Sequence, residues 1–483
     1  MRTRTIGLYL LLTTALLATA ARAEEAPLAL PIPPPRRFAV AALPPPPPRP
    51  VEASPLARLI PEDLERIALE RNPTIAQAVD RFEQARGRAF QAGAYPNPLI
   101  IWSAPDLGEQ GTAGQQQALF QQPVVTGGKL RLNRARLEVD VESHRWLVVE
   151  QQMLVRNGVR MRCLQVLAQQ DLLRLGKELT ARADEVVRTT RENVESGHAS
   201  EADLLTAENE AAEEARSLEV LAERYLNSWR ELAAYLGDPD MRPVEIDGGL
   251  GGEMREFSWE PTLDRLLRES PELRVAELIV RRQELSLERE RREPIPDLVV
   301  RLGTTHDPNN GRTTGYARLY ADLPLWDRNR GNIYAAERAL LELRRDVDRV
   351  RLNLQQRLAR DFNHHRTGLV NLRRFGDGIL PRARRAFEIY LEEFAAEQAN
   401  YSRVQSSRSA YAEASVKYIE ELLELRRAEV AIDGLQLVEE AVEVGTLRPP
   451  GSGRLQPPGE GSVVNTPPGG GVPVGRPYRG NSG

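Results

Sequence analysis

The chain of 483 residues carries 65 Lys and Arg against 69 Asp and Glu, and this near-balance gives no overall field that would attract nucleic acid. Its single cysteine, Cys163, excludes an intrachain disulfide and a metal cage built from cysteines. Aromatic residues make up 5% of the chain and charged residues 28%, a composition typical of long helices rather than of one compact core.

The first 23 residues have the pattern of a secretory signal peptide. Arg2 and Arg4 precede an apolar run over residues 6–18, and Ala21-Arg22-Ala23 forms a small-x-small cleavage site. An uncleaved anchor is the alternative, but the apolar run is short for crossing a bilayer, and no later stretch approaches the roughly 18 apolar residues of a membrane helix. We therefore expect an exported chain that begins near Glu24 and enters a membrane, if at all, through β-strands.

Two segments rich in proline or glycine flank the region expected to fold. Residues 24–60 include five consecutive prolines at 44–48, and residues 446–483 combine Gly and Pro. These compositions predict an extended linker before the folded region and a disordered tail after it.

Between these segments lies an internal duplication. Prolines recur at a near-constant offset, so that Pro73, Pro98 and Pro123 correspond to Pro271, Pro296 and Pro324. Such regularity over most of the region is hard to obtain by chance. We assign residues 61–237 to a first repeat, 238–260 to a linker and 261–445 to a second repeat.

Each repeat is predicted to run as helix, two strands, very long helix and returning helix. In the first repeat these elements are expected at residues 62–94, 99–103, 118–125, 129–197 and 201–236. In the second they are expected at residues 261–293, 297–304, 314–323, 331–398 and 402–444. Pro381, which follows Gly376 and Gly378, is expected to kink the second long helix.

The length of the long helices argues against an ordinary globular core. A helix over residues 129–197 would be roughly 100 Å long. The two shorter helices of that repeat together contain as many residues, so they would cover the long helix if stacked end to end. Apolar residues in the second long helix follow the spacing of a coiled coil at Leu340, Leu343, Val347, Val350, Leu354 and Leu358. A purely structural rod would show the same spacing.

The predicted strands alternate between apolar and polar residues. The apolar residues Ala317, Leu319, Ala321 and Leu323 alternate with the polar residues Tyr316, Arg318, Tyr320 and Asp322, and residues 298–303 alternate in the same way. One apolar and one polar face suits a wall between lipid and water, although a soluble two-sided hairpin is the alternative. Four strands cannot close a membrane barrel, and an open edge in lipid leaves backbone groups unsatisfied. Several chains must therefore pool their strands.

At the ends of the strands the sequence resembles a known family, the TolC-like outer membrane efflux proteins, and the duplicated plan over about residues 61–444 is similar too. The most specific matches are the junctions Phe-Gln-Gln-Pro-Val-Val-Thr-Gly-Gly-Lys at 120–129 and Leu-Pro-Leu-Trp-Asp-Arg-Asn-Arg-Gly-Asn at 323–332. The second junction is similar in particular to the heavy-metal, CzcC-like branch. A third match is the turn within residues 197–208.

The resemblance implies a mainly α fold with a small β part. Long helical hairpins would form an α-barrel, and four strands per chain would contribute to a trimeric twelve-strand outer-membrane β-barrel. It further implies a homotrimer in the outer membrane of a diderm bacterium, with its helical part in the periplasm. The partners would be outer-membrane lipid, a periplasmic adaptor (membrane fusion protein) and an inner-membrane RND-type pump. The expected function is a passive exit duct, with metal ions among the candidate substrates.

Two sets of residues follow as site candidates. Residues that end a strand, permit unusual dihedrals or cap a helix are expected at the strand-to-helix junctions, and these are Pro123, Gly127, Gly128, Pro324, Asp327, Asn329 and Gly331. Thr126 is a second predicted cap beside Asp327. Charged or turn residues at the periplasmic tips are candidates for a gate, and these are Glu195, Gly197, Glu201, Asp203, Glu397 and Arg403. Glu397 stands where the family usually places a glycine.

No catalytic constellation is found, and no cofactor, metal site or nucleic-acid partner is expected. His364 and His365 are adjacent, so they face different ways on a helix and do not form an i, i+4 metal pair. Two alternatives to a duct remain. A periplasmic coiled-coil scaffold or adaptor would lack the amphipathic strand pairs, and a secreted enzyme would need a polar constellation that the sequence does not show.

Overall fold

The computed structural model describes residues 60–106, 108, 114–308, 310–396, 398 and 400–438. The chain divides into the units Met1–Ala57 and Arg58–Gly483, and all described residues belong to the second. The predicted signal peptide, the proline-rich linker up to residue 59 and the tail lie outside the described residues. Across the described ranges, no helix combines the length and apolarity needed to cross a membrane.

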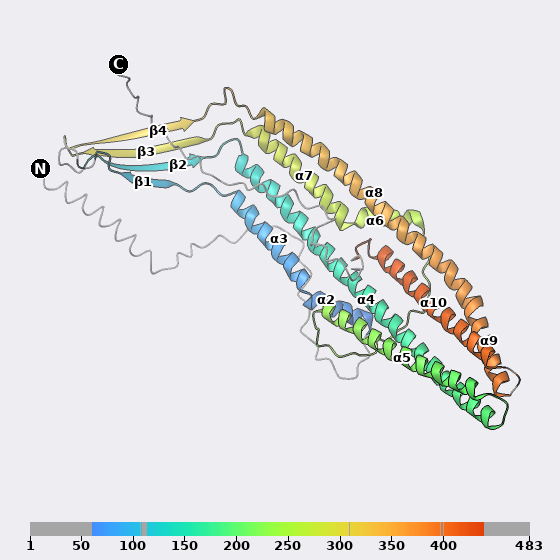
Figure 1. Cartoon of the computed structure of the whole chain (residues 1–483). Coiled ribbons are helices and arrows are strands. Elements are labelled where there is room, and N and C mark those ends of the chain that lie inside the picture. The colour runs from blue at the N-terminus through green and yellow to red at the C-terminus, as the bar shows by residue number, and fades with distance from the viewer. Residues whose placement is uncertain are drawn as a thin grey trace, which may run out of the picture. The chain divides into compact units, whose positions relative to one another are not determined.

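One order of elements occurs twice along the unit (Figure 1). It is first built from α2 (Pro61–Arg71), α3 (Pro73–Ala92), β1 (Leu99–Ser103), β2 (Gln116–Val124), α4 (Lys129–Glu195) and α5 (Glu201–Leu236). It is then built from α6 (Trp259–Glu269), α7 (Pro271–Arg292), β3 (Leu298–Asp307), β4 (Arg312–Ala321), α8 (Arg330–Arg374), the π-helix η2 (Phe375–Ile379), α9 (Leu380–Ala395) and α10 (Tyr401–Asp433). The predicted mainly helical fold with four strands is confirmed.

The first helix predicted in each repeat is in fact two helices. Pro73 and Pro271 have no backbone N–H to donate, and proline pushes the residue before it out of the helical region. Asn72 and Ser270 accordingly adopt ψ values of 119° and 117°. Each of them also accepts, through its side chain, a hydrogen bond from a backbone N–H in the first turn of the next helix. Uninterrupted helices over 62–94 and 261–293 were therefore wrong predictions.

The long helix α4 carries the shorter helices of its repeat along its length, since α2, α3 and α5 all pack against it (Figure 1). The break between α2 and α3 meets the end of α5. There Asn72 Nδ2 donates to Tyr235 O at 3.0 Å, and Arg71 pairs with Asp238 at 2.6 Å. Gly237 ends α5 with φ 81°, and a Cβ there would lie 2.9 Å from the Arg71 carbonyl oxygen. The expected stacking along the long helix is thus present.

The second long helix is not continuous. Pro381 is the second residue of α9, so it cannot donate to the carbonyl of Asp377, and its ring crowds that carbonyl. The chain accommodates the proline with the π-helix at Phe375–Ile379, a single wider turn. The predicted irregularity at Pro381 therefore lies in the turn that precedes it.

The largest hydrophobic cluster lies where both repeats meet the linker between them. Trp229 and Leu236 from α5 are fully buried there together with Leu425 from α10. The linker contributes Ile246 and Leu250 to the same cluster. Each such fully buried apolar side chain contributes about 1.5–3 kcal/mol relative to its exposed state. The linker is therefore a packed part of the fold.

The four strands form one antiparallel sheet in the order β1-β2-β3-β4 (Figure 1). Within each repeat the two strands pair as neighbours, and β2 pairs with β3 to join the repeats. Among the described strands, β1 and β4 each have one side without a strand partner. The sheet is thus a ribbon with two free edges.

Candidate functional site

One face of the sheet is apolar and exposed. The register places Ile100, Phe120, Leu302 and Ala317 in one row across all four strands. Trp102 and Leu319 lie on the same face, and the exposed fractions of Ile100, Trp102 and Leu319 are 76%, 68% and 67%. The predicted alternation is confirmed, because Leu319 shares this face with Ala321, whereas Arg318 and Tyr320 lie on the opposite face.

The opposite face is polar and carries a cluster of arginine, tyrosine and glutamine. Gln121, Arg301 and Arg318 form one row across β2, β3 and β4. Arg301 Nε donates to Gln121 Oε1 at 2.7 Å, and its guanidinium lies 4.6 Å from the centre of the Tyr320 ring. Arg318 lies 4.7 Å from the centre of the Tyr316 ring. Arg301 and Arg318 are therefore held by neutral partners.

At the first strand-to-helix junction, two glycines make the turn. Pro123 lies in β2 beyond the stretch that β1 covers, so its missing N–H breaks no ladder bond on that side. Gly127 and Gly128 have φ values of 65° and 71°, the left-handed region that glycine adopts freely. A Cβ on Gly127 would also come within 3.1 Å of Ile295 Cδ1. Gly127 therefore needs glycine for both reasons, and Gly128 needs it for its positive φ alone.

Asp297 fixes this junction from the neighbouring repeat. Its Oδ1 accepts hydrogen bonds from Thr126 N at 2.9 Å and from Lys129 Nζ at 3.2 Å. Thr126 does not cap α4 through its side chain, because its hydroxyl donates to Pro296 O at 2.5 Å and the N-cap is Gly128. The predicted Thr126 cap was therefore wrong.

At the second strand-to-helix junction, an asparagine rather than a glycine adopts the left-handed backbone conformation. Asn329 is the N-cap of α8 with φ 58°, and its Nδ2 donates to Glu290 O at 2.9 Å. Asp327 Oδ1 accepts from Asn329 N at 2.9 Å, which tightens the turn but does not cap the helix as predicted. Pro324 precedes this turn outside β4. Gly331 lies inside α8, and a Cβ there would meet nothing within 4 Å.

At the tips the predicted gate residues mostly shape their own turns. Gly197 turns the chain with φ 79°, between Glu195 at the end of α4 and Glu201 at the start of α5. Asp203 accepts a hydrogen bond from the Ser200 backbone N–H at 3.1 Å, while the Ser200 hydroxyl accepts from Asp203 N at 3.2 Å. The hydrogen bonds from Ser200 lower the pKa of the Asp203 carboxyl below its ordinary value.

The returning helix at the second tip is also capped by a side chain, but its cap does not involve an acid. Asn400 caps α10 by accepting from Arg403 N at 3.3 Å, and the Arg403 guanidinium lies 6.0 Å from the centre of the Tyr390 ring. Glu397 lies outside the described residues. Among the described residues, the acids of the first tip form no ion pair with Arg403.

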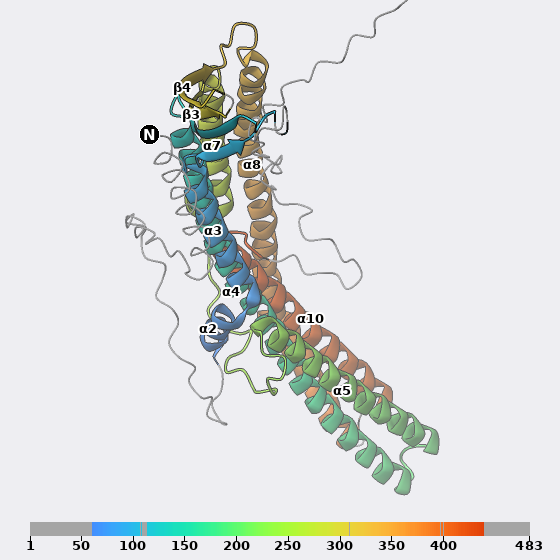
Figure 2. The same ribbon diagram turned by 90° about the vertical axis from the view of Figure 1, so that its left-hand side faces the viewer.

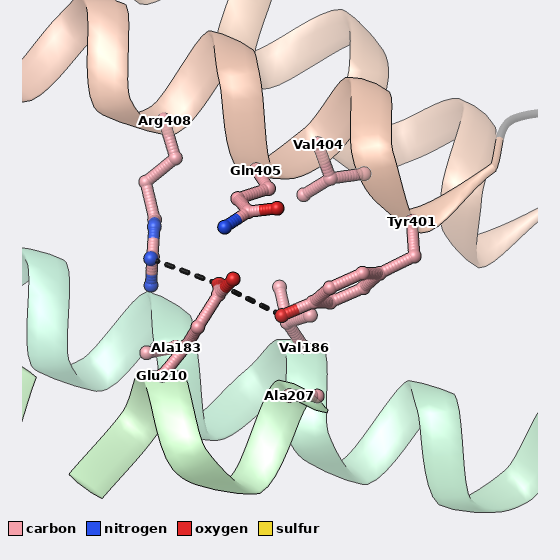
Figure 3. A pocket seen from close by; sticks show the side chains of 8 residues that line it. All are labelled: Ala183, Val186, Ala207, Glu210, Tyr401, Val404, Gln405 and Arg408. Atoms are coloured by element: carbon pink, nitrogen blue, oxygen red, sulfur yellow. Dashed lines mark hydrogen bonds and ion pairs between the residues drawn. The ribbon is translucent and has the colours of Figure 1, made fainter. Parts of the chain in front are cut away.

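An ionic link between the returning helices of the two repeats lies further along α5 and α10 (Figure 3). Glu210 of α5 accepts a hydrogen bond from the Tyr401 hydroxyl at 2.8 Å and pairs with Arg408 Nη2 at 3.1 Å, both from α10. Glu214 lies one turn along α5, with its Oε1 3.7 Å from the same nitrogen. Two acids of the first repeat thus converge on one arginine of the second.

This link is largely shielded from water. The Arg408 side chain is 10% exposed and that of Glu210 is 18% exposed. Ala183, Val186 and Val404 line the same small pocket (Figure 3). Burial, together with the bond to Glu210, raises the pKa of the Tyr401 phenol, so it stays a neutral donor. Sequence reasoning missed this site because the acid and its two partners lie in separate repeats, with no local spacing signal.

Two further candidate residues, His365 and Cys163, are buried in the packed interior. His365 is 1% exposed, and its Nε2 lies 3.0 Å from Arg255 O. Cys163 is buried, and burial raises the pKa of its thiol to about 12. In the described part of the chain, no three His, Cys, Asp or Glu side chains are grouped so as to hold a metal ion.

Comparison with known proteins gives matches in sequence. Residues 64–238 match the family described as outer membrane efflux protein. The cobalt-zinc-cadmium resistance protein CzcC of Cupriavidus metallidurans is 24% identical over 373 residues, covering 76% of this chain and 87% of the relative. The nickel-cobalt-cadmium resistance protein NccC of Alcaligenes xylosoxydans xylosoxydans is 27% identical over 310 residues, covering 62% of this chain and 68% of the relative.

Solved structures with the same fold include a transmembrane channel and an outer membrane protein. CusC superimposes with a TM-score of 0.66 at 11% identity, covering 78% of this chain and 91% of CusC. VceC of Vibrio cholerae superimposes with a TM-score of 0.64 at 15% identity, covering 78% of this chain and 96% of VceC.

Proposed function

This chain belongs to the outer membrane efflux protein family and is an outer-membrane efflux channel, and we propose that it works as the homotrimeric exit duct of a pump that expels divalent metal ions. Such a channel is not an enzyme. The proposal rests on the sheet, because its apolar face is exposed and its two edge strands each have one side without a strand partner among the described strands.

The sheet supports assembly into a trimer. Exposed rows of unpaired backbone groups on β1 and β4 would be costly in lipid, where no water can satisfy them. Pairing β4 of one copy with β1 of the next satisfies both edges, and three copies supply twelve strands. The apolar face with Ile100, Trp102 and Leu319 then meets lipid, and the polar face with Arg301 and Arg318 lines the duct.

The helical hairpins supply the periplasmic part. We propose that the turns at Gly197 and before Asn400 form the end that docks on a periplasmic adaptor, which in turn binds an RND-type pump in the inner membrane. Both turns join a long helix to a returning helix, and in both cases a side chain caps the N-terminus of the returning helix. Figure 1 shows the two hairpin ends at the same side of the unit, away from the sheet.

The proposal of metal ions as cargo comes from the relatives. CzcC and NccC are named for resistance to cobalt, zinc, cadmium and nickel. Both align with most of their length to this chain. In a passive duct the pump selects the cargo, so the chain needs only to let hydrated ions pass.

We propose that the contacts of Glu210 with Tyr401 and Arg408 hold the gate closed, rather than the charged residues at the tips. Arg408 and Tyr401 tie α10 to α5 at one carboxylate, and breaking these contacts would free the second hairpin to move. A shielded ion pair with a neutral second donor is a contact that adaptor binding could exchange at a cost of a few kcal/mol. Glu195, Glu201, Asp203 and Arg403 then shape the turns that the adaptor meets.

The test is metal tolerance in the native bacterium. A strain lacking this chain is grown on cobalt, zinc and cadmium, and is complemented with the wild type or with Leu319→Arg, which places a charge on the apolar face. We expect loss of tolerance on deletion, full rescue by the wild type and failed rescue by the variant. Unchanged tolerance after deletion would overturn metal export, whereas a soluble periplasmic product would overturn the channel and favour a coiled-coil scaffold.

A further inference from the structure

We propose that Arg301 and Arg318 form an anion-attracting ring in the duct, which makes its outer section prefer small inorganic anions over cations. The inference rests on the proposed trimer, because that assembly turns the polar face of the sheet toward the lumen. It assigns a specificity role to residues that lie far from the tips and their gate.

The first observation is the pairing of like charges. Arg301 and Arg318 are direct cross-strand partners in the β3–β4 register, so their side chains leave the same face from Cα atoms about 5 Å apart. Like charges placed directly opposite each other destabilise a sheet. Natural proteins usually tolerate such an unfavourable pairing where a function requires it.

The second observation is how the pair is tolerated. Arg301 is held by Gln121 and the Tyr320 ring, and Arg318 by the Tyr316 ring. These partners orient each guanidinium without neutralising it, because tyrosine rings attract a cation through their π-faces and glutamine carries no charge. The positive charge therefore remains available to ions in the duct.

The third observation is the shortage of acids on the strands. Among the described strand residues the only carboxylate is Asp307, and it lies opposite Arg312 at the far end of the β3–β4 ladder. The rows on either side of the arginine pair contain Val299 with Tyr320 and Gly303 with Tyr316. No acid in the strands thus compensates Arg301 and Arg318.

Threefold assembly multiplies this charge at one level. Equivalent residues of three copies lie at the same height, so the pair becomes a ring of six guanidinium groups. Rings of arginine or lysine are how pores favour anions, and low-dielectric walls focus such a field on the lumen. Exported metal ions would then pass this section accompanied by anions concentrated there.

The experiment measures ion selectivity of the purified full-length channel in planar bilayers under a potassium chloride gradient. The chloride-to-potassium permeability ratio of the wild type is expected to exceed one. Arg301→Gln combined with Arg318→Gln should lower that ratio by about twofold or more at low salt, where the Debye length exceeds about 10 Å, and less at high salt. Arg301→Lys combined with Arg318→Lys keeps the charge and should keep the ratio.

A matched control is Arg312→Gln, which removes an arginine from the same face where Asp307 lies opposite. It should change the ratio less than the double Gln variant does. A conducting wild-type channel that prefers potassium, or whose ratio the double Gln variant leaves unchanged, would overturn the arginine ring and leave the duct intact. A chain that forms no conducting trimer would instead overturn the proposed function on which the ring rests.

Discussion

The two repeats of this chain share one plan but differ in their long hairpins. In the first, α4 runs unbroken over 67 residues before the turn to α5. In the second, the π-helix at Phe375–Ile379 separates α8 from α9 before the turn to α10. Their returning helices also differ in charge, because Glu210 of α5 faces Arg408 of α10. Figure 2 shows α5 and α10 running in the same direction along the unit.

The difference indicates a division of labour between repeats. Long α-helices curve only gently where nothing interrupts them, whereas a π turn within a helix is a common place for a kink and occurs frequently at functional sites. The hinged hairpin is also the one that carries the basic half of the ionic link. We therefore propose that the first hairpin is the fixed support and that the second hairpin moves when the link opens.

The largest expected effect concerns the glycines that end the returning helices. Gly237 has φ 81° beside the Arg71 carbonyl, whereas Gly434 has φ −81° and faces the Asn157 amide. Gly237→Ala should lower the free energy of unfolding by about 1–3 kcal/mol, because alanine is strained at this positive φ. Its Cβ would also clash with the Arg71 carbonyl oxygen, a backbone atom that cannot easily move aside. Gly434→Ala should displace the Asn157 amide and leave its polar atoms unsatisfied, at about 1–3 kcal/mol.

Thermal unfolding of the purified variants in detergent measures both costs. Adding Asn157→Ala should recover part of the loss in the Gly434 variant and none in the Gly237 variant. Equal recovery in both would contradict the assigned causes.

The next effect concerns the ionic link. Arg408→Ala should cost about 1–3 kcal/mol, because it leaves the shielded Glu210 and Glu214 without their cation. Adding Glu210→Gln should restore part of that loss, and Tyr401→Phe alone should cost about 0.5–1.5 kcal/mol. A double-mutant cycle from thermal unfolding yields the coupling between the two repeats, and Arg403→Ala is the control outside the link. Zero coupling would remove the link from the account of the gate.

A smaller, local effect is expected at the hinge. Pro381→Ala restores the missing N–H, so the segment can form a regular α-helix like α4. Amide hydrogen exchange over residues 375–385 should slow in this variant, while exchange in the middle of α4 stays unchanged. Metal tolerance should fall if the hinge serves opening. Undiminished exchange would mean that Gly376 and Gly378 sustain the π turn without the proline.

The smallest effect is a pH dependence confined to the first tip. The pKa of Asp203 is lowered by its bonds with Ser200, so its contribution to stability is complete above the ordinary Asp pKa of about 4 and is lost as the pH falls through the lowered value. The second tip is capped by Asn400, which does not titrate. Amide exchange, corrected for pH, should therefore increase at residues 200–206 in acid and not at 401–406. Parallel increases at both tips would contradict this.

Sequence patterns predicted the regular features of this fold and missed those that depend on contacts across it. The period-two alternation around Leu319 gave the correct faces of the sheet, because register follows the apolar pattern. The breaks at Asn72 and Ser270 carried a visible cap-and-proline signal, but the apolar pattern continued through them. Glu210 and Arg408 are 198 residues apart, each within an ordinary polar helix surface, so no local spacing marked them.

We propose that three copies of this chain pool their strands into one outer-membrane duct. The most direct test of this assembly is to express the full chain in a diderm bacterium, isolate the outer membrane and cross-link the detergent extract. A cysteine pair with one residue on β1 and one on β4, in a background with Cys163→Ala, joins the free edges of neighbouring copies. We expect disulfide-linked trimers in the outer-membrane fraction, with no larger species. A monomer that persists at every concentration, or a product recovered from the soluble periplasm, would contradict it.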